Sequence, residues 1–528
     1  MSPSQLRIAP SSTRQALDTA RETVFSSRKP RLLRNFAGLW TLAFLFGSLG
    51  CGEAPTGPNI VILVQDTVRP DRLSVYGSPE PTSPFLESFA AEGTRFDRAY
   101  SSSSWTLPAH ASLFTGASAA IHGATQSLPA VNTTIPLLAE QLDDAGYQTA
   151  AFSANMWVSE LAGLHRGFEH FENLNKGIYP GHILELASDP QGVSRPPDTH
   201  YVVRQVLRWL DEGREASRPY FLFINLVDPH MPYLPDWHSA REFLPSRQAR
   251  FEAIRRYYPN AKPARLLLRH YFREDPLSAD EWQTLAAMYD GTLRLVDTIT
   301  DTIVSAIDQR SDPDNTLVFI LSDHGENLGD HGHVGHFFNL YDSNLRILLL
   351  ARGPGFPPGS VEKTLVQIGD IYTTALGAAG ITPPEHSSGV DLRQPLPEHR
   401  VLEASLEYPK ISLDVFKRIR PSKQLERYEV ALKAAVGPRY KLIQSTTTEG
   451  QLVREEIFDI LNDPDEQHPL TVDAVDPPAL AALRAVVAEK GTAPRGQANN
   501  LEEIDPESRE ALQALGYLSD DDPPEMED

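Results

Sequence analysis

Four stretches of the chain are almost uninterrupted apolar runs that end in polar residues. They lie at residues 58–66 (PNIVILVQD), 218–230, 315–325 and 345–355. A strand with one solvated face would alternate apolar and polar positions, whereas a strand covered on both faces does not. The four runs therefore predict buried strands of a parallel sheet.

Segments with helical periodicity separate these runs, at residues 133–146, 199–213 and 282–309. Alternation of strands and helices predicts an α/β sandwich of three layers around a mostly parallel central sheet. In such sheets, ligands bind at the carboxyl ends of the strands. The polar residues that close each apolar run are therefore the first candidates for a functional site.

The C-terminal part has a different pattern. Residues 376–403 are rich in Pro and Gly, and the shorter alternating segments between residues 428 and 467 predict a small antiparallel sheet, followed by a helix at 477–491. We expect a catalytic α/β domain at 58–400, a C-terminal subdomain at 401–518 packed on it, and an acidic tail at 519–528.

The N-terminal residues 1–51 have the features of a targeting segment. Fifteen uncharged residues, 36–50, follow four basic residues and precede Cys51, and this run is too short to span a bilayer comfortably. The pattern resembles a bacterial lipoprotein signal, and an uncleaved membrane anchor is the alternative. Both place the protein outside the cytoplasm, in the cell envelope or periplasm, anchored through this segment or a lipidated Cys51, or secreted.

Composition narrows the classes of partner. The formal net charge is −22 and the isoelectric point is near 5.2, which argues against nucleic acid as a partner. A single cysteine excludes an intramolecular disulfide and a zinc site built from several cysteines. An anionic substrate would need a metal ion, or the arginine-rich stretch 241–273, which is more typical of a solvated helical surface.

Acidic residues and a histidine close two of the apolar runs. Asp66 ends the first run, and Asp323 and His324 follow the third. Any one of these carboxylates could simply cap a helix, but two Asp and one His at one sheet edge can bind a divalent cation. Gln65 could add a carbonyl oxygen to this site.

Two further histidines are candidates for acid–base chemistry. His230 follows the second run in the segment DPHMPY, and His336 closes a segment with four histidines in thirteen residues. A histidine at the same edge as the acidic residues is a candidate general acid. A second metal site is the alternative, with Asp228, His230 and His336 as ligands.

The order of five motifs resembles the sulfatase family of the alkaline phosphatase superfamily. These are NIVILVQD, TLPAHASLFTG, DPHMPY, SDHGENLGDHG, and YKLI with EEIFDILNDPDEQ, and the resemblance covers residues 58–518. It implies an alkaline-phosphatase-like sandwich with a small C-terminal antiparallel sheet. It also implies a metal-dependent hydrolase of sulfate esters.

The resemblance assigns the nucleophile position to Thr106 and the following arginine position to His110. Family members carry Cys or Ser at the first position, which is oxidised to formylglycine. Oxidation of a threonine side chain would give a ketone, so formylglycine is not expected at Thr106. Next to a metal, the Thr106 hydroxyl can attack directly, and Thr106 could also serve only as the N-cap of the following helix.

The resemblance also implies the rest of the site. Asp66, Asp323, His324 and Gln65 match the metal ligands, with calcium as the expected ion and manganese or zinc as alternatives. His230 matches an active-site histidine, and His336 stands where many members have a lysine. Because the family's Gly-Lys-x-His segment is absent, Asn155 is the remaining candidate for that part of the site.

Three functions therefore stay open. The first is sulfate ester hydrolysis. The second is phosphodiester or phosphonate hydrolysis, or phosphoryl transfer, with Thr106 as nucleophile. The third is non-catalytic binding of sulfated glycans. The expected substrate is a sulfated or phosphorylated small molecule or glycan.

Overall fold

The computed structural model describes residues 57–174, 188–191, 200–259, 264–272 and 277–489. The predicted targeting segment at 1–51 and the acidic tail at 519–528 lie outside these residues. Within the described part of the chain, no helix is long and apolar enough to cross a membrane.

The centre of the fold is an eight-stranded sheet with the order β11-β2-β10-β7-β1-β6-β4-β5. Its five strands from β7 to β5 are parallel, which confirms the predicted α/β class. They are β7 (Thr316–Leu321), β1 (Asn59–Gln65), β6 (Tyr220–Leu226), β4 (Gln148–Ser153) and β5 (His170–Asn173). Every residue of β1, β6 and β7 is buried, as the apolar runs predicted. Every residue of β4 is buried too, but none of the predicted runs included this strand.

The other edge of this sheet departs from the parallel pattern. Strand β10 (Leu349–Arg352) pairs antiparallel with β7 and with β2 (Thr94–Phe96), and β11 (Ser360–Glu362) pairs parallel with β2. The run 345–355 is thus a buried strand, but its predicted parallel direction is wrong. An apolar run reports burial on both faces and carries no information about strand direction.

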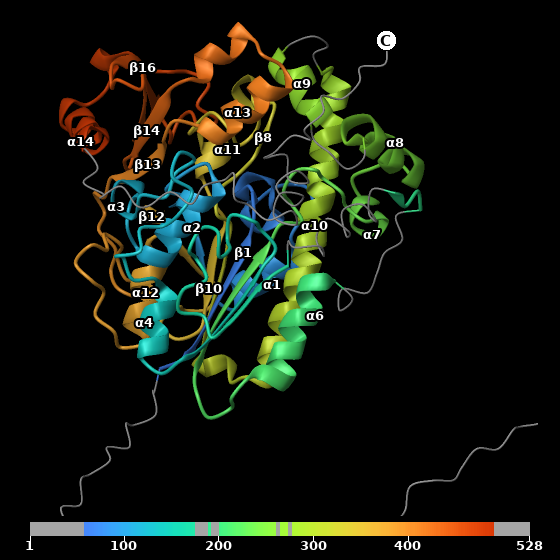
Figure 1. The fold of residues 1–528 in the computed structure, drawn as a ribbon, viewed down its shortest axis with the longest axis vertical. Coiled ribbons are helices and arrows are strands. Elements are labelled where there is room, and N and C mark those ends of the chain that lie inside the picture. Colours follow the sequence, from blue (N-terminus) through green and yellow to red (C-terminus); the bar gives the residue numbers. More distant parts are fainter. Residues whose placement is uncertain (1–56, 175–187, 192–199, 260–263, 273–276, 490–528) are drawn as a thin grey trace, which may run out of the picture. The chain divides into compact units, whose positions relative to one another are not determined.

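Helices cover the sheet on both sides (Figure 1). One group is α2 (Thr106–Thr115), α4 (Leu138–Asp144) and α12 (Asp370–Ala378), and the other is α1 (Pro84–Ala91), α6 (Tyr201–Arg208) and α10 (Ala279–Arg310). Shorter or peripheral helices are α3 (Ala119–His122), α7 (Trp237–Ala240), α8 (Arg247–Tyr257), α9 (Ala264–Phe272), α11 (Asp342–Leu345) and α13 (Lys410–Ile419). The layers are those of the predicted sandwich.

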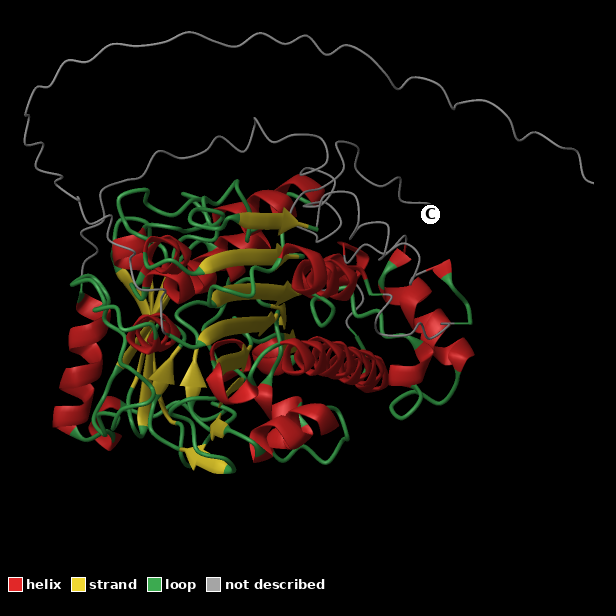
Figure 2. Ribbon diagram, turned by 90° about the horizontal axis from the view of Figure 1, so that it is seen from below, coloured by secondary structure: helices red, strands yellow, loops and turns green. Residues whose placement is uncertain are grey.

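A second sheet of four antiparallel strands follows, as predicted. It contains β13 (Leu402–Leu406), β14 (Ala431–Val436), β15 (Tyr440–Thr446) and β16 (Leu452–Asp459), and α14 (Pro477–Ala488) packs on it. Strands with different directions are visible in Figure 2. A separate apolar cluster, including Leu442, Ile457, Leu480 and Leu483, joins this sheet to α14. The described residues from 57 to 489 fall into one compact unit, so the boundary near residue 400 stays a prediction.

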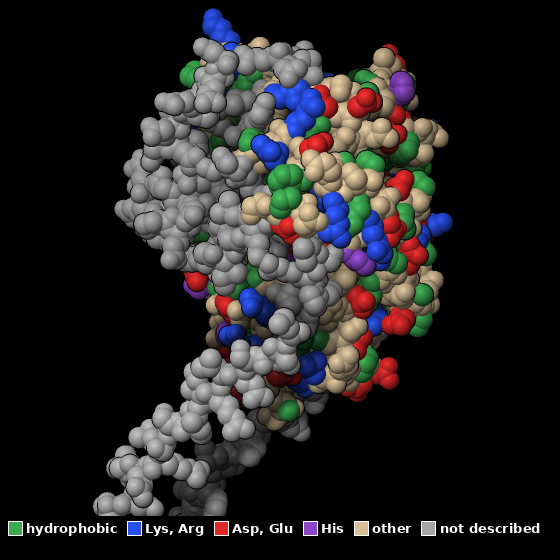
Figure 3. All heavy atoms as spheres, turned by 90° about the vertical axis from the view of Figure 1, so that its right-hand side faces the viewer, with side chains coloured by type: hydrophobic (Ala, Val, Ile, Leu, Met, Phe, Trp, Pro, Cys, Tyr) green, Lys and Arg blue, Asp and Glu red, His purple; other side chains and the backbone are tan. Residues whose placement is uncertain are grey.

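The face of the molecule drawn in Figure 3 carries both signs of charge. In Figure 3, acidic and basic side chains are interspersed among the coloured residues. In the arginine-rich stretch, Arg247, Arg255 and Arg256 of α8 are exposed, but Arg250 is fully buried and its Nε donates to the Pro235 carbonyl at 2.5 Å. The interpretation as a solvated surface is therefore wrong for Arg250.

Candidate active site

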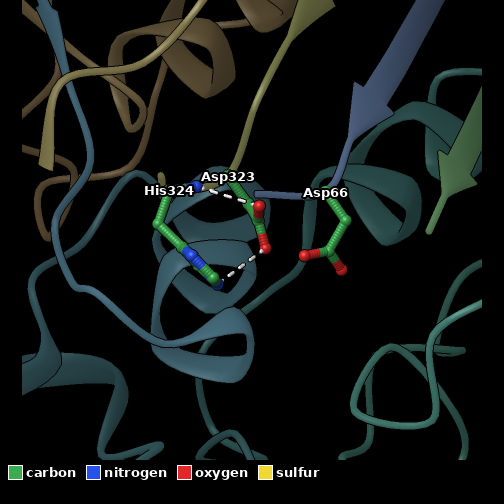
Figure 4. A group of neighbouring side chains, drawn as sticks. All are labelled: Asp66, Asp323 and His324. Carbon is green, nitrogen blue, oxygen red and sulfur yellow. Dashed lines mark hydrogen bonds and ion pairs between the residues drawn. The ribbon is translucent and has the colours of Figure 1, made fainter. Parts of the chain in front are cut away.

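Two neighbouring parallel strands bring the predicted metal ligands together. Asp66 directly follows β1, and Asp323 and His324 follow β7. Their ligand atoms all lie within 4.8 Å of one another, and all three residues are buried (Figure 4). The carboxyl ends of parallel strands meet at one sheet edge, so residues more than 250 positions apart in sequence become neighbours.

Hydrogen bonds hold one oxygen of each carboxylate. Asp323 Oδ1 accepts from the backbone N–H groups of Thr67 (3.2 Å) and His324 (2.9 Å). Asp66 Oδ2 accepts from Asn155 Nδ2 at 2.6 Å, and Asn155 follows β4. The other two oxygens, Asp66 Oδ1 and Asp323 Oδ2, are buried and have no hydrogen-bond partner within the described residues.

These two carboxylates fit a cation electrostatically. Burial raises the pKa of Asp66, and the nearby Asp323 raises it further. Burial also raises the pKa of Asp323, above the opposing effects of His110 and of backbone hydrogen bonds. Two buried carboxylates with unpartnered oxygens are costly unless a positive charge compensates them. A divalent cation supplies that charge, and the donor set suits it.

His324 has the tautomer that a metal ligand requires. Its Nδ1 lies 2.9 Å from the carbonyl oxygen of Gly325, which can only accept, so Nδ1 carries the hydrogen and Nε2 carries the lone pair.

Gln65 is less clearly oriented as a metal ligand. Its amide nitrogen donates to Thr300 Oγ1 at 2.8 Å, and its buried Oε1 has no partner in the described chain. Its role as a ligand stays a prediction.

Thr106 lies beside this group. It is the first residue of α2 and is fully buried, and its Oγ1 lies 3.3 Å from His324 Nε2. Because Nε2 carries the lone pair, the Thr106 hydroxyl donates to it. The N-cap of α2 is Trp105, which has an extended backbone, so the interpretation of Thr106 as the N-cap is wrong. Peptide N–H groups at a helix start favour an anion.

His110 contacts the backbone of Thr106 and not its hydroxyl. Its Nδ1 donates to the Thr106 carbonyl at 2.9 Å and lies 3.6 Å from Asp323 Oδ2. On the other side, His110 Nε2 lies 3.5 Å from Asn225 Nδ2. Burial lowers the pKa of His110. These contacts allow His110 to position Thr106 and Asp323, while a direct catalytic role stays a prediction.

His230 and His336 lie next to each other in the same buried region. Their ring centroids are 5.1 Å apart, and those of His336 and His324 are 4.5 Å apart. Burial lowers the pKa of each of His230 and His336 to about 3. Both rings are therefore neutral at physiological pH, and either must first accept a proton before it can act as a general acid.

The alternative of a second metal site does not agree with the geometry. Asp228 Oδ1 pairs with His200 Nε2 at 3.0 Å. In the described ranges, Asp66, Asp323 and His324 are the only group of His, Cys, Asp and Glu with metal-ligand spacing.

Two residues of the site were not predicted. Glu326 is fully buried, and its Oε1 lies 3.1 Å from His336 Nδ1. Its position two residues after His324 could have suggested it. Thr67 has a positive φ of 60° and is fully buried, and its N–H holds Asp323. Nothing in the sequence distinguishes Thr67, because backbone strain depends on the surrounding fold.

Comparison with known proteins identifies similar sequences and similar folds. The chain is 24% identical over 439 residues to arylsulfatase K from Bos taurus, covering 78% of each chain. Among solved structures, a phosphonate monoester hydrolase of Agrobacterium radiobacter superimposes with a TM-score of 0.62 at 21% identity, over 82% of this chain and 94% of the other. A protein in complex with its substrate D-glucosamine-2-N,6-O-disulfate gives 0.60 at 18% identity, over 89% and 100%.

The structural likeness establishes the fold at these identities, and the family is established by sequence. Residues 58–381, more than half of the chain, match the model of the sulfatase family. This range contains every candidate site residue named above. The chain therefore belongs to the sulfatase family, whose members are hydrolases that act on ester bonds.

Proposed function

We propose that this protein is a metal-dependent hydrolase of sulfate esters in which the Thr106 hydroxyl is the nucleophile. One observation carries the proposal. The Thr106 Oγ1 lies 3.3 Å from Nε2 of His324, within a buried group that includes two carboxylates with unpartnered oxygens. A hydroxyl in this position would lie at the edge of the proposed cation site.

Asp66, Asp323 and His324 would hold the metal, with Gln65 as a further oxygen donor. The two carboxylates favour calcium, and the imidazole admits manganese or zinc. A bound divalent ion lowers the pKa of a neighbouring hydroxyl and offsets negative charge on the ester. Asn155 and the N–H groups of Thr67 and His324 keep the carboxylates in place.

The protein residues then carry out the transfer. Thr106 Oγ1 forms a bond to sulfur as the bond from sulfur to the leaving oxygen breaks. The proton of Thr106 passes to a neutral imidazole, for which His230 and His336 are the candidates, and from there to the leaving oxygen. Water then hydrolyses the ester on Thr106. The helix start that carries Thr106 favours the anionic group.

Sulfated sugars are the substrate class that the relatives support. One structural neighbour holds D-glucosamine-2-N,6-O-disulfate as its substrate. We also propose that the protein is located outside the cytoplasm, directed there by the N-terminal segment and Cys51, which agrees with a substrate of this kind. Both points belong to the proposal.

A second candidate is hydrolysis of phosphodiesters or phosphonate monoesters. The unmodified hydroxyl of Thr106 favours it. An ester formed on a plain alcohol such as Thr106 must be cleaved by a second attack, by water, at its sulfur or phosphorus atom. A formylglycine hydrate would avoid that second attack, and Thr106 cannot form it. Phosphoryl transfer to another acceptor would follow the same first step.

The test compares p-nitrophenyl sulfate, bis-p-nitrophenyl phosphate and a phosphonate monoester, each with added calcium, manganese or zinc. We expect turnover of the sulfate, and a fall in kcat of roughly 10³-fold or more in Thr106→Ala. Thr106→Ser keeps a hydroxyl and is the matched variant, with activity expected within about tenfold of the parent.

The other outcomes either favour one of the two alternative functions or reject Thr106 as the nucleophile. Turnover of only the phosphorus esters would favour the second candidate. Unchanged activity in Thr106→Ala would reject the nucleophile. Metal binding without turnover of any ester would favour the third possibility, a protein that binds sulfated glycans. Mass spectrometry of the quenched reaction should find the sulfuryl or phosphoryl group on Thr106.

A further inference from the structure

A cavity of about 260 Å³ lies between residues 331–341 and the C-terminal sheet. Its second wall is formed by residues of β14, β15 and β16 and by the short helix that ends at Tyr428. Phe338 lines the cavity, and its ring packs on that of Phe337 (6.0 Å between centroids), which in turn stacks on His336 (5.1 Å). These packed rings separate the cavity from the active site, so an ester that reacts at Thr106 is not its expected occupant.

The wall of this cavity is largely aromatic and aliphatic. Phe338 and Tyr428 are stacked with centroids 4.4 Å apart, and Leu340 and Val430 line the cavity beside them. Apolar side chains with a few polar groups among them are typical of a surface that binds a partly apolar partner.

One polar group in the wall is a buried hydrogen-bond donor. Asn339 is 4% exposed, and its Oδ1 accepts from Tyr341 N (3.2 Å) and from Asn344 Nδ2 (3.1 Å). Its Nδ2 has no partner in the described part of the molecule. A buried amide that uses its oxygen twice and its nitrogen not at all indicates a missing acceptor.

The cavity also presents a cation. The exposed Arg427 guanidinium lies 4.6 Å from the Tyr428 ring, and within the described ranges it forms no ion pair. The acid in the wall, Glu456, accepts from Arg454 and from the Tyr341 hydroxyl. The cavity therefore suits a partner that combines apolar side chains with carboxylates.

The C-terminal end of the chain, which lies outside the described residues, has this chemistry. Residues 501–528 contain eleven acidic residues and one basic residue, Arg509. Between residues 507 and 518 the larger apolar residues are Leu512, Leu515, Tyr517 and Leu518. Apolar residues flanked by carboxylates complement an apolar wall that carries an unpaired arginine.

The described chain also ends beside the cavity wall. The carbonyl of Glu489, directly after α14, accepts from Lys433 Nζ at 2.6 Å, and the neighbouring Leu432 of β14 lines the cavity. Four strands make this sheet roughly 15 Å wide, whereas the chain from Glu489 to Tyr517 can extend to roughly 90 Å. The chain is therefore long enough to pass around the sheet and reach the cavity.

We propose that this cavity is the docking site of residues 507–518 of the same chain. Tyr517 would lie against Phe338 and Tyr428, and the acidic residues of the segment would pair with Arg427. A carbonyl or carboxylate oxygen of the segment would accept from Asn339 Nδ2. In this way the C-terminal segment would hold residues 331–341, which include His336, against the C-terminal sheet.

Hydrogen exchange of the full-length chain, followed by mass spectrometry of its peptides, tests this docking. In the wild type, amides of residues 511–518 should exchange at least about tenfold more slowly than in a synthetic peptide of residues 501–528. Arg427→Gln and Tyr517→Ala should each reduce this protection by about fivefold or more. Tyr517→Ala should also speed the exchange of residues 337–341, because the segment no longer covers them.

Two variants are the matched controls. Arg439 also lies over a tyrosine ring, that of Tyr440 at 4.9 Å, and belongs to the same sheet region, but it does not line the cavity. Met526 is an apolar residue of the C-terminal end outside 507–518. In Arg439→Gln and in Met526→Ala, the protection of residues 511–518 should stay within about a factor of two of the wild type.

Three results would overturn the proposal. Residues 511–518 might exchange in the wild type as fast as in the synthetic peptide. Protection that is unchanged in both Arg427→Gln and Tyr517→Ala would place the segment elsewhere. Protection that rises with protein concentration would place the segment of a second copy in the cavity. None of these measurements requires turnover of an ester, so the result is independent of the proposed function.

Discussion

At the scale of single residues, Asn155 determines the geometry of a metal ligand without being one itself. Its amide nitrogen holds Asp66 Oδ2 at 2.6 Å, and its own oxygen accepts from Trp157 N at 2.8 Å, which fixes the amide orientation. Residues that orient metal ligands typically contribute 10- to 100-fold in metal affinity. Asn155→Ala should therefore weaken binding of the preferred cation by about 10- to 100-fold in a calorimetric titration.

Asn132→Ala is the control, because Asn132 is also buried but its side chain holds the turn at Thr134. An equal loss of metal affinity in both variants would indicate a general loss of structure. An unchanged affinity in Asn155→Ala would mean that Asp66 does not depend on this hydrogen bond.

A second residue-scale prediction concerns acid stability. His122 is fully buried, and its Nδ1 accepts from the backbone N–H of Ala124 at 3.1 Å, a bond that protonation would break. Burial lowers its pKa to about 3, below the ordinary value near 6.5. Between these pH values the unfolded chain binds a proton that the native chain does not, so stability falls as pH falls.

Urea unfolding of the wild type and of His122→Gln from pH 7 to pH 4 tests this point. The slope of unfolding free energy against pH should be smaller in the variant by up to about 1.4 kcal/mol per pH unit. His468→Gln, at an imidazole whose side chain is 86% exposed, is the control. Identical slopes in His122→Gln and the wild type would contradict the assignment.

The sequence allowed part of the site to be predicted for a simple reason. Asp66, Asp323 and His324 each close a buried apolar run, so their shared edge follows from the sheet rule alone. The residues that contact Asp323 and His336 could not be found in this way. Glu326 and Thr67 act through side-chain and backbone directions that emerge only when distant loops pack together.

At the scale of elements, α2 explains why its motif ends in Thr-Gly. Gly116 follows the last helical residue with φ of +66°, the left-handed conformation that favours glycine at helix ends. A Cβ on Gly116 would also meet Ser387 Oγ at 2.4 Å and Tyr372 Cδ1 at 2.6 Å. The C-terminal end of α2 is thereby packed against Tyr372 of α12 and against Ser387.

Gly116→Ala should therefore destabilise the protein by about 2 to 4 kcal/mol, from left-handed strain and from steric overlap together. Gly380→Ala is the matched control. Gly380 has a similar φ of +75°, but nothing lies within 4 Å of its hypothetical Cβ. It should lose only about 1 kcal/mol, and equal losses in urea unfolding would show that the contacts at Gly116 contribute nothing.

Element type was easier to predict than element limits or direction. The long periodic segment 282–309 lies within α10, whereas the helix expected at 133–146 begins only at Leu138. Pro136 disfavours helical backbone at the residue before it, and the Glu140 carboxylate then accepts from Leu137 N at 2.7 Å, which fixes the start. The antiparallel direction of β10 depends on which strand it meets, and no local pattern encodes that choice.

At the scale of the whole molecule, the site is assembled from segments that are far apart in sequence. Residues after β1, β4, β6 and β7 and at the start of α2 contribute to it, and they extend from Asp66 to His336. A metal ion bound by Asp66, Asp323 and His324 would link β1 and β7 directly. Because the unfolded chain lacks this arrangement, metal binding should stabilise the fold as a whole.

Metal removal tests that link. Treatment with a chelator should lower Tm, and a divalent ion at about 100 times its Kd should restore about 2.7 kcal/mol of unfolding free energy. Calcium, manganese and zinc can be ranked by the size of this effect. Asp323→Asn removes one carboxylate charge from the group and should abolish most of the metal-dependent increment.

The same variant should change the metal-free protein in the opposite direction. Burial and the neighbouring Asp66 make a charged Asp323 unfavourable in the absence of a cation, since two buried carboxylates lie within the same group. Asp323→Asn should thus unfold at an equal or higher temperature than the chelated wild type. If it unfolds at a lower temperature and still responds fully to metal, Asp323 acts as a structural hydrogen-bond acceptor and not as a ligand.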